Sequence, residues 1–153
     1  MGKNDGYHVS ASAEDYLEAI YLICNQKGVA RSRDIMEHLS VSGPSVTEAL
    51  QLLKKKDLVN YTPYEAITLT EQGECIAQDV LHRHVRLKEF LVEVLCVEEH
   101  VADEGACKME HVVSEEIIDR MIRYRRFLQQ DCKGKQCDQY LSFREYIGLS
   151  VSD

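Results

Sequence analysis

Apolar residues recur with helical spacing in the N-terminal part of the chain. In residues 12–25 they fall at positions i, i+3, i+4 and i+7, namely Leu17, Ile20, Tyr21 and Cys24. This spacing predicts a helix with Ser12 as its N-cap. Residues 32–40 predict a short second helix, capped by Ser32, with an inner face of Ile35, Met36 and Leu39.

A third helix and two short β-like runs follow. Gly43 breaks the chain, and Pro44 suits the first turn of a new helix. The apolar stripe of that helix consists of Val46, Ala49, Leu50 and Leu53. Residues 58–61 and 67–70 are rich in β-branched and apolar side chains, and the short polar turn between them predicts a hairpin. Two short helices, a tight turn containing glycine and a hairpin form a winged helix-turn-helix pattern.

The third predicted helix carries the candidate DNA contacts. In such units this helix enters the major groove with its N-terminal residues foremost, and free N–H groups there bind phosphate. Small polar residues approach bases closely, and lysines near the helix end reach the backbone. The expected DNA-binding residues are Arg31, Arg33, Ser42, Pro44, Ser45, Thr47, Glu48, Gln51 and Lys54. The alternative is a plain three-helix domain with a solvated polar face.

The rest of the chain also reads as helical. Residues 71–96 predict one long helix, residues 106–113 a short helical segment, and a final helix runs from a cap at Ser114 to about Leu128. The final helix is apolar on more than one side, through Ile117, Ile118, Met121, Ile122, Tyr124, Phe127 and Leu128. A helix apolar on two sides is buried on two sides, which predicts a dimer interface in addition to a core.

The expected fold is therefore mainly α, with two domains and a tail. Residues 1–74 form the winged helix-turn-helix domain, residues 75–130 an all-helical metal-binding and dimerisation domain, and residues 131–153 a polar C-terminal tail. Hydrophobic residues make up 44% and charged residues 29%, as in a globular protein. No apolar run has the length of a membrane span or signal peptide, so we expect a cytoplasmic protein without membrane partners.

Charge and cysteine placement sharpen the functional interpretation. The net charge is −8, and residues 93–119 alone hold nine acids and one base, which also sums to −8. Residues 27–63 hold six bases and four acids, a net of +2. A basic segment beside an acidic one suits a DNA-binding part next to a cation-binding part. Six scattered cysteines without a CxxC pair favour buried thiols or ligands over disulfides.

The acidic region contains a candidate metal motif. Cys107, Glu110 and His111 are spaced i, i+3 and i+4, so on a helix all three would project from one side. Cysteine, carboxylate and imidazole are ligands for divalent transition metals. The alternative is a polar helix with a buried cysteine.

Other predicted helices carry further candidate ligands on their inner sides. Asp15 and Glu18 are spaced i, i+3 on the first helix, and His84 interrupts the apolar stripe of the long helix. Singly, Asp15 could complete a capping pair, Glu18 could be a solvated acid, and His84 could be a core histidine. Together these groups would be costly to bury without a divalent cation.

The stretches "AEDYLEAIY", "SVSGPSVTEALQLLKKKDLV", "HRHVRLKEFL" and "CKMEHVVSEE" follow in an order and spacing that resemble the DtxR/MntR family. This is the diphtheria-toxin-repressor and manganese-transport-regulator family of metal-dependent transcriptional repressors. The resemblance covers roughly residues 10–130. It implies a two-domain form with a winged-helix domain, a helical dimerisation domain and metal ligands from both.

The resemblance also implies roles for single residues. Asp15, Glu18 and His84 match ligands of the manganese branch, and Glu110 and His111 match the pair shared with the iron branch. Cys107 replaces a glutamate of the manganese branch and matches the iron branch. The iron branch's ancillary site has glutamate and histidine where this chain has Lys88 and Asp103. The resemblance also points to Ser42, Pro44, Ser45 and Glu48 as DNA-facing. Glu48 departs from the glutamine or lysine of relatives, and an acid near phosphates is unfavourable unless it accepts from a cytosine amino group.

We therefore expect a homodimeric repressor, not an enzyme, that binds palindromic double-stranded operator DNA when loaded with metal. Fe²⁺ or Mn²⁺ is the expected cofactor, and the thiolate makes Zn²⁺ or Co²⁺ possible in vitro. The resemblance implies metal-uptake genes as targets. The main alternative is a metal-independent winged-helix regulator that senses redox state or a small molecule through its cysteines. A metalloenzyme is a weaker alternative, since there is no HExxH motif.

Overall fold

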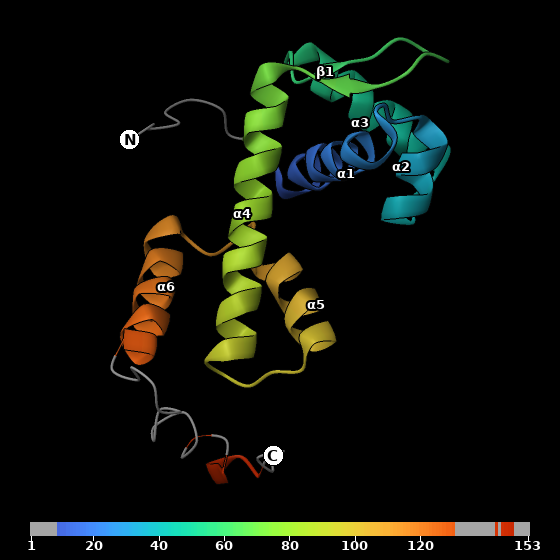
Figure 1. Ribbon diagram of the computed structural model, residues 1–153. Helices are drawn as coiled ribbons and strands as arrows, with labels where there is room; N and C mark the ends of the chain where they lie inside the picture. The colour runs from blue at the N-terminus through green and yellow to red at the C-terminus, as the bar shows by residue number, and fades with distance from the viewer. Residues whose placement is uncertain (1–8, 131–142, 144, 149–153) are drawn as a thin grey trace. The chain divides into compact units, whose positions relative to one another are not determined.

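The computed structural model describes residues 9–130, 143 and 145–148. The expected C-terminal tail, including Cys132 and Cys137, lies almost entirely outside these residues. The elements are α1 (Ala11–Lys27), α2 (Ser32–Leu39), α3 (Gly43–Lys55), β1 (Val59–Asn60), β2 (Thr68–Leu69), α4 (Glu71–Glu93), α5 (Glu99–Met109) and α6 (Glu115–Gln130), shown in Figure 1. The expected mainly α fold is confirmed.

The chain divides into two compact units, Met1–Leu81 and His82–Asp153, and α4 contributes residues to both. The domain boundary expected after residue 74 stays a prediction. No helix in the described part of the chain is both long enough and apolar enough to cross a membrane.

The helix starts correct two cap predictions. The N-cap of α1 is Ser10, whose Oγ accepts from Ala13 N at 3.3 Å, so the prediction of Ser12 was wrong. The N-cap position of α2 holds Arg31 instead of Ser32, and Arg31 N donates to Asp34 Oδ2 at 3.0 Å. Both cap residues have an extended backbone, but only Ser10 accepts a hydrogen bond from a free N–H group of the first turn, since the Arg31 side chain has no acceptor.

The first unit is built as the apolar pattern predicts. α1 packs against α2, α3 and β2, and the fully buried side chains include Leu17, Ile20, Ile35, Leu50 and Leu53. The hairpin is confirmed as an antiparallel pair, with Val59 opposite Leu69. An isolated bridge between Ala30 and Ile67 joins the connection before α2 to the hairpin. Burying each large apolar side chain contributes roughly 1.5–3 kcal/mol, which makes this core the main stabilising term of the unit.

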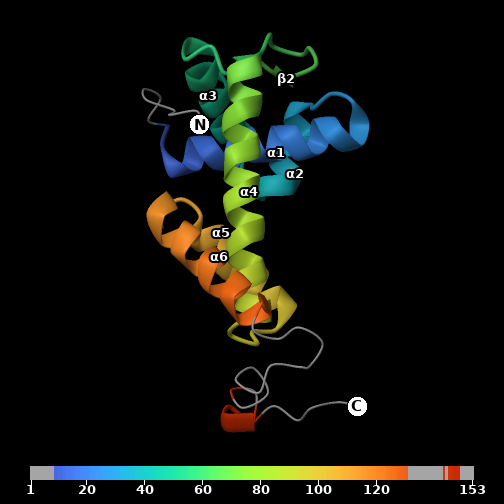
Figure 2. The ribbon, with the colours of Figure 1, turned by 60° about the vertical axis from the view of Figure 1, so that its left-hand side comes forward.

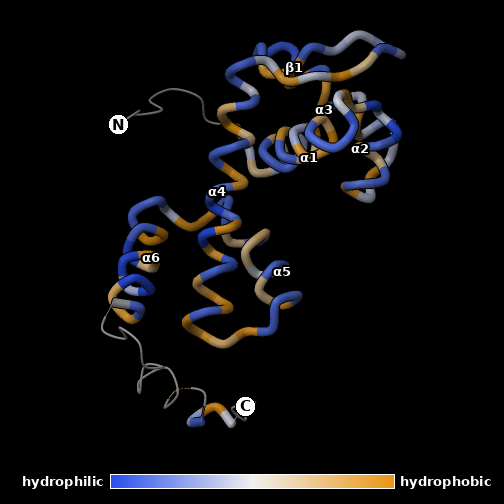
Figure 3. The backbone as a smooth tube through the Cα atoms, viewed as in Figure 1, coloured by the Kyte–Doolittle hydropathy of each residue, from blue (hydrophilic) through white to orange (hydrophobic). Residues whose placement is uncertain are grey.

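The second unit packs α5 and α6 along the later part of α4 (Figure 2). Its core holds Leu87, Ala106, Ile118 and Ile122. Arg86 Nη1 donates to Glu115 Oε1 at 2.7 Å, and Arg125 pairs with Glu89 and Glu93 of α4. Apolar and polar residues alternate along both α4 and α6 (Figure 3), so each helix has one side for the core and another for solvent.

Two element boundaries differ from the predictions. The long helix ends at Glu93 instead of 96, since Cys96 has φ +55°, a left-handed conformation that a helix cannot continue through. The next helix spans Glu99–Met109, whereas the sequence predicted helical residues 106–113. Apolar spacing did not predict the first half of α5, because acidic residues interrupt the apolar positions there.

Candidate metal centre and DNA-binding surface

The end of α5 changes the geometry expected for the cysteine motif at one residue. The helix ends at Met109, and Glu110 is its C-cap residue, with helical dihedrals (φ −59°, ψ −26°) and an N–H that donates to Ala106 O. Cys107 and Glu110 therefore keep their helical spacing, whereas His111 lies in the turn that follows. Cys107 is exposed on α5, whereas Glu110 is completely buried at 0% exposure. A thiol at the surface and a carboxylate in the core have different environments and different reactivity.

The carboxylate of Glu110 lies between two imidazoles. His84 Nδ1 donates to Glu110 Oε2 at 2.7 Å, and His111 Nε2 lies 3.4 Å from Glu110 Oε1. Oε1 makes no hydrogen bond with any described residue, although it is fully buried. A buried carboxylate oxygen without a hydrogen bond is costly, so the site favours a positive charge beside Glu110.

The pKa of His84 reflects these contacts. The hydrogen bond to Glu110, with a smaller contribution from Asp103, raises this pKa from 6.5 to about 9, although burial opposes the shift. At neutral pH the imidazole is therefore protonated, and it supplies the positive charge that Glu110 needs. A metal ion that took His84 as a ligand would have to displace this proton.

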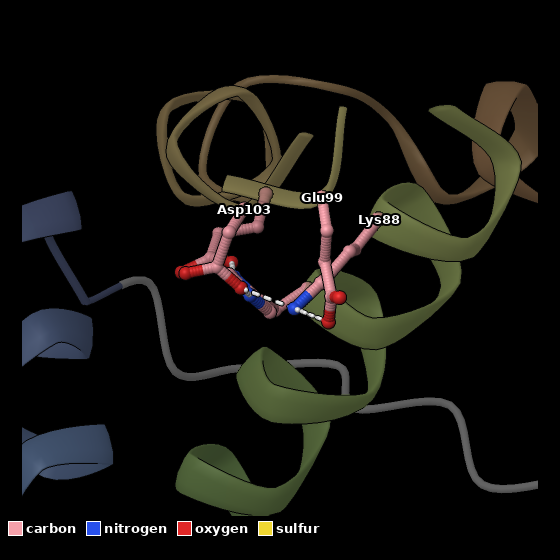
Figure 4. A network of polar contacts seen from close by, with 5 residues as sticks. Lys88, Glu99 and Asp103 are labelled. Carbon is pink, nitrogen blue, oxygen red and sulfur yellow. Dashed lines mark hydrogen bonds and ion pairs between the residues drawn. The ribbon is translucent and has the colours of Figure 1, made fainter. Parts of the chain in front are cut away.

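Asp103 is a contact of His84 that the sequence analysis missed as a functional residue. Asp103 Oδ1 lies 3.2 Å from His84 Nε2 and 2.9 Å from Lys88 Nζ. Figure 4 shows the Lys88 ammonium between Asp103 and Glu99, whose Oε1 is 3.3 Å away. The ammonium first, and His84 second, hold the pKa of Asp103 below its usual value. The available signal was the i, i+4 spacing of Asp103 and Cys107 on α5.

The expected ligand set is only partly assembled. Within the described residues, no three His, Cys, Asp or Glu side chains are grouped closely enough to hold a metal ion as they stand. His84, Glu110 and His111 adjoin one another in the second unit, and Cys107 is exposed. Asp15 and Glu18 are half-buried on α1 in the first unit. Oxygen and imidazole donors around a buried carboxylate nevertheless fit a divalent transition metal.

The carboxylate of Asp15 affects the pKa of the neighbouring Tyr16. Burial raises the pKa of the Tyr16 hydroxyl, and the nearby carboxylates of Asp15 and Glu48 raise it further. Both carboxylates belong to the first unit, so α1 and α3 present acids toward the same tyrosine. The two carboxylates would attract a cation to this part of the first unit.

The nine expected DNA-binding residues are all exposed: Arg31, Arg33, Ser42, Pro44, Ser45, Thr47, Glu48, Gln51 and Lys54. Val46, Leu50 and Leu53 are buried on the opposite side of α3. Ser42 is the N-cap, with its Oγ 2.8 Å from Ser45 Oγ. The polar side of α3 is thus available to a ligand while the apolar side holds the helix in place.

The structure adds two exposed residues that the sequence analysis did not single out. Leu52 is 53% exposed and lies one turn after Glu48 on α3, and Tyr64 is fully exposed at the hairpin tip with φ +69°. Leu52 lies outside the apolar stripe of α3, and neither residue carries a charge, so charge and periodicity pass over both. Both can make apolar contacts with DNA, Leu52 with a thymine methyl group for example.

Two family models match almost the whole described chain. Residues 8–67 match the model described as "Iron dependent repressor, N-terminal DNA binding domain". Residues 70–138 match the model described as "Iron dependent repressor, metal binding and dimerisation domain". The first match contains α1 to α3, and the second contains Glu110 and both imidazoles.

Individual relatives agree with these matches. An uncharacterized HTH-type transcriptional regulator of Methanocaldococcus jannaschii is 40% identical over 114 residues, which cover 74% of this chain and 91% of that protein. A solved manganese-dependent transcriptional repressor in complex with manganese is 28% identical, with a TM-score of 0.67, covering 75% of this chain and 53% of its own. The crystal structure of T. acidophilum IdeR is 30% identical, with a TM-score of 0.63, and the match covers 78% of this chain and 55% of the IdeR chain. The chain thus spans about half the length of these two solved proteins.

Proposed function

Because this chain belongs to the iron-dependent repressor family, we propose that it represses transcription by binding operator DNA as a metal-loaded homodimer. The observation that carries the metal dependence is Glu110, a fully buried carboxylate flanked by two imidazoles and with one oxygen lacking a hydrogen bond. The DNA-binding part is supported by the exposed polar side of α3.

We assign the ligands as follows. Glu110, His84 and His111 form the part of the metal centre in the second unit, and Cys107 joins it from the adjacent turn of α5. Asp15 and Glu18 contribute carboxylates from the first unit. When bound, the metal ion supplies the positive charge that compensates these acids. Carboxylates and imidazoles suit Fe²⁺ and Mn²⁺, and the Cys107 thiolate raises the affinity for Fe²⁺, Zn²⁺ and Co²⁺.

Ligands in both units connect metal binding to DNA binding. Like charge disfavours bringing the carboxylates of Asp15, Glu18 and Glu110 together, and a shared metal ion would offset that repulsion. With metal, the ligand set favours the arrangement of the two α3 helices that matches the operator. A differential metal affinity of about 3 kcal/mol between the two arrangements would change DNA affinity by about a hundredfold.

The exposed side of α6 provides the surface for a second copy. Ile117, Tyr124 and Phe127 are each slightly more than half exposed on this helix, and the rings of Tyr124 and Phe127 stack with centroids 6.4 Å apart. Two copies joined through α6 would have two-fold symmetry, so we propose a palindromic operator with two half-sites.

The test is an anaerobic selection of DNA fragments by the purified protein with chelator, Mn²⁺, Fe²⁺ or Zn²⁺. We expect a palindromic sequence to be enriched only with metal. Glu110→Gln should abolish this metal response, whereas Glu104→Gln, which alters an exposed acid on α5, should leave it unchanged. Equal enrichment with chelator and with metal would refute the proposal. A response to oxidants in the presence of chelator would favour a cysteine-based sensor.

A further inference from the structure

Two helices of the second unit present an ordered series of charged groups to each other. On α4, His84 and Lys88 are one turn apart, and on α5, Glu99, Asp103 and Cys107 are spaced at successive turns. Asp103 lies in the middle of this series. Its Oδ1 atom is 3.2 Å from His84 Nε2 and 2.9 Å from Lys88 Nζ, so one oxygen joins the candidate metal centre to the lysine.

The Lys88 ammonium occupies the place between two carboxylates. Its Nζ lies 2.9 Å from Asp103 Oδ1 and 3.3 Å from Glu99 Oε1 (Figure 4). The Lys88 side chain is 28% exposed, whereas those of Asp103 and Glu99 are 54% and 81% exposed. The two hydrogen bonds, Asp103 first, raise the pKa of Lys88, so the group stays charged at any physiological pH. The chain itself therefore places a permanent cation between the two carboxylates.

We propose that Lys88 is an internal cation that closes the Glu99–Asp103 carboxylate pair to metal, so that each subunit holds one divalent ion, at Glu110, and no second one. The inference rests on the metal centre proposed above. A divalent ion bound by the same two carboxylates would lie within a few ångströms of the ammonium, and like charges at that separation repel strongly. Removing the ammonium leaves two carboxylates one helical turn apart, with oxygen donors suited to Mn²⁺.

The experiment measures how many Mn²⁺ ions each subunit binds. Full-length protein and the Lys88→Met variant are dialysed anaerobically against a series of Mn²⁺ concentrations, and bound metal is determined by elemental analysis. Methionine keeps an unbranched apolar side chain and removes the charge. We expect one ion per subunit in the unchanged protein and two in Lys88→Met, the second at least tenfold weaker. Adding Asp103→Asn to Lys88→Met should remove the second ion.

Matched variants separate this effect from a general change of charge or folding. Lys88→Arg keeps the cation and should bind one ion. Lys108→Met removes one positive charge from an exposed position on α5 and should also bind one ion. Circular dichroism checks the fold, and Lys88→Gln replaces Lys88→Met if the latter does not fold.

The outcomes distinguish this inference from the proposed function. Two ions in the unchanged protein would overturn the role of Lys88. One ion in both the unchanged protein and Lys88→Met would overturn it too. Neither result would affect the proposed metal sensor. Two ions in Lys88→Arg or Lys108→Met would overturn the role of Lys88 as well. No bound Mn²⁺, Fe²⁺ or Zn²⁺ in the unchanged protein would overturn the proposed metal centre and this inference together.

Discussion

Gly73 offers a sharp test of how the hairpin is joined to α4. It lies in the first turn of α4, and a Cβ added there would be 2.0 Å from Leu58 O and 3.0 Å from Leu58 C. Ordinary contacts of this kind begin at 3.4 Å. Gly73→Ala would therefore force the first turn of α4 or the Leu58 backbone to move by more than about 1 Å.

The energetic cost follows from what Leu58 does. Its carbonyl accepts from Thr70 N at 3.1 Å, its N–H donates to Leu53 O at 3.0 Å, and its side chain is fully buried. Displacing this backbone weakens about one hydrogen bond, worth roughly 1 kcal/mol. Repacking an overfilled core adds about 1–3 kcal/mol. Since alanine gains about 1 kcal/mol in helix propensity, we expect a net destabilisation of about 1–3 kcal/mol.

A second helical glycine provides the matched control. In α5, a Cβ at Gly105 would meet only Leu91 Cδ1, at 3.4 Å, which is an ordinary contact. Gly105→Ala should therefore stabilise the protein by about 0.5–1 kcal/mol through helix propensity. Urea unfolding followed by circular dichroism, with chelator present, measures both variants against the unchanged protein. Equal midpoints for Gly73→Ala and the unchanged protein would refute the close approach of α4 to Leu58.

Three further predictions concern charge and assembly. Glu110 first, and Asp103 second, raise the pKa of His84 from 6.5 to about 9 against the effect of burial, so the stabilisation from these contacts is complete below about pH 6.5 and is lost as the pH rises through 9. The Tm of the protein with chelator should fall across this window, and a parallel fall in His84→Gln would contradict the assignment. Lys54→Ala should lower the slope of log K for DNA against log salt by about one, as for a phosphate contact; an unchanged slope would exclude that contact. Phe127→Asp should give a monomer in sedimentation velocity, with Arg126→Ser as the dimeric control; a dimeric Phe127→Asp would remove α6 as the interface.

Much of the fold was determined by local sequence patterns. The i, i+3, i+4 and i+7 apolar spacing identified α1, and Leu17 and Ile20 are indeed completely buried. Gly43 and Pro44 located the start of α3, and two short β-like runs located the hairpin. These features are local because helix periodicity, capping and turn chemistry depend on residues within a few positions of one another.

Local patterns were less reliable at element ends. The sequence analysis predicted Ser12 as the cap of α1, whereas the extended backbone at Ser10 makes Ser10 the cap. The expected arrangement of His111 beside Cys107 assumed that the helix continued past Met109 and Glu110. Where a helix ends depends on how the next segment packs, and that information is not contained in the helix itself.

The candidate metal centre was decided in part by residue type and in part by tertiary structure. The sequence supplied His84, Glu110 and His111 as candidates, because carboxylates and imidazoles at those positions match metal-ligand chemistry. Only the packing of α5 on α4 buried Glu110 against an imidazole 26 residues away, and only that packing placed Lys88 between Asp103 and Glu99. The physical reason is that burial and charge pairing are set by contacts distant in sequence, whereas hydrophobic periodicity is set by neighbours.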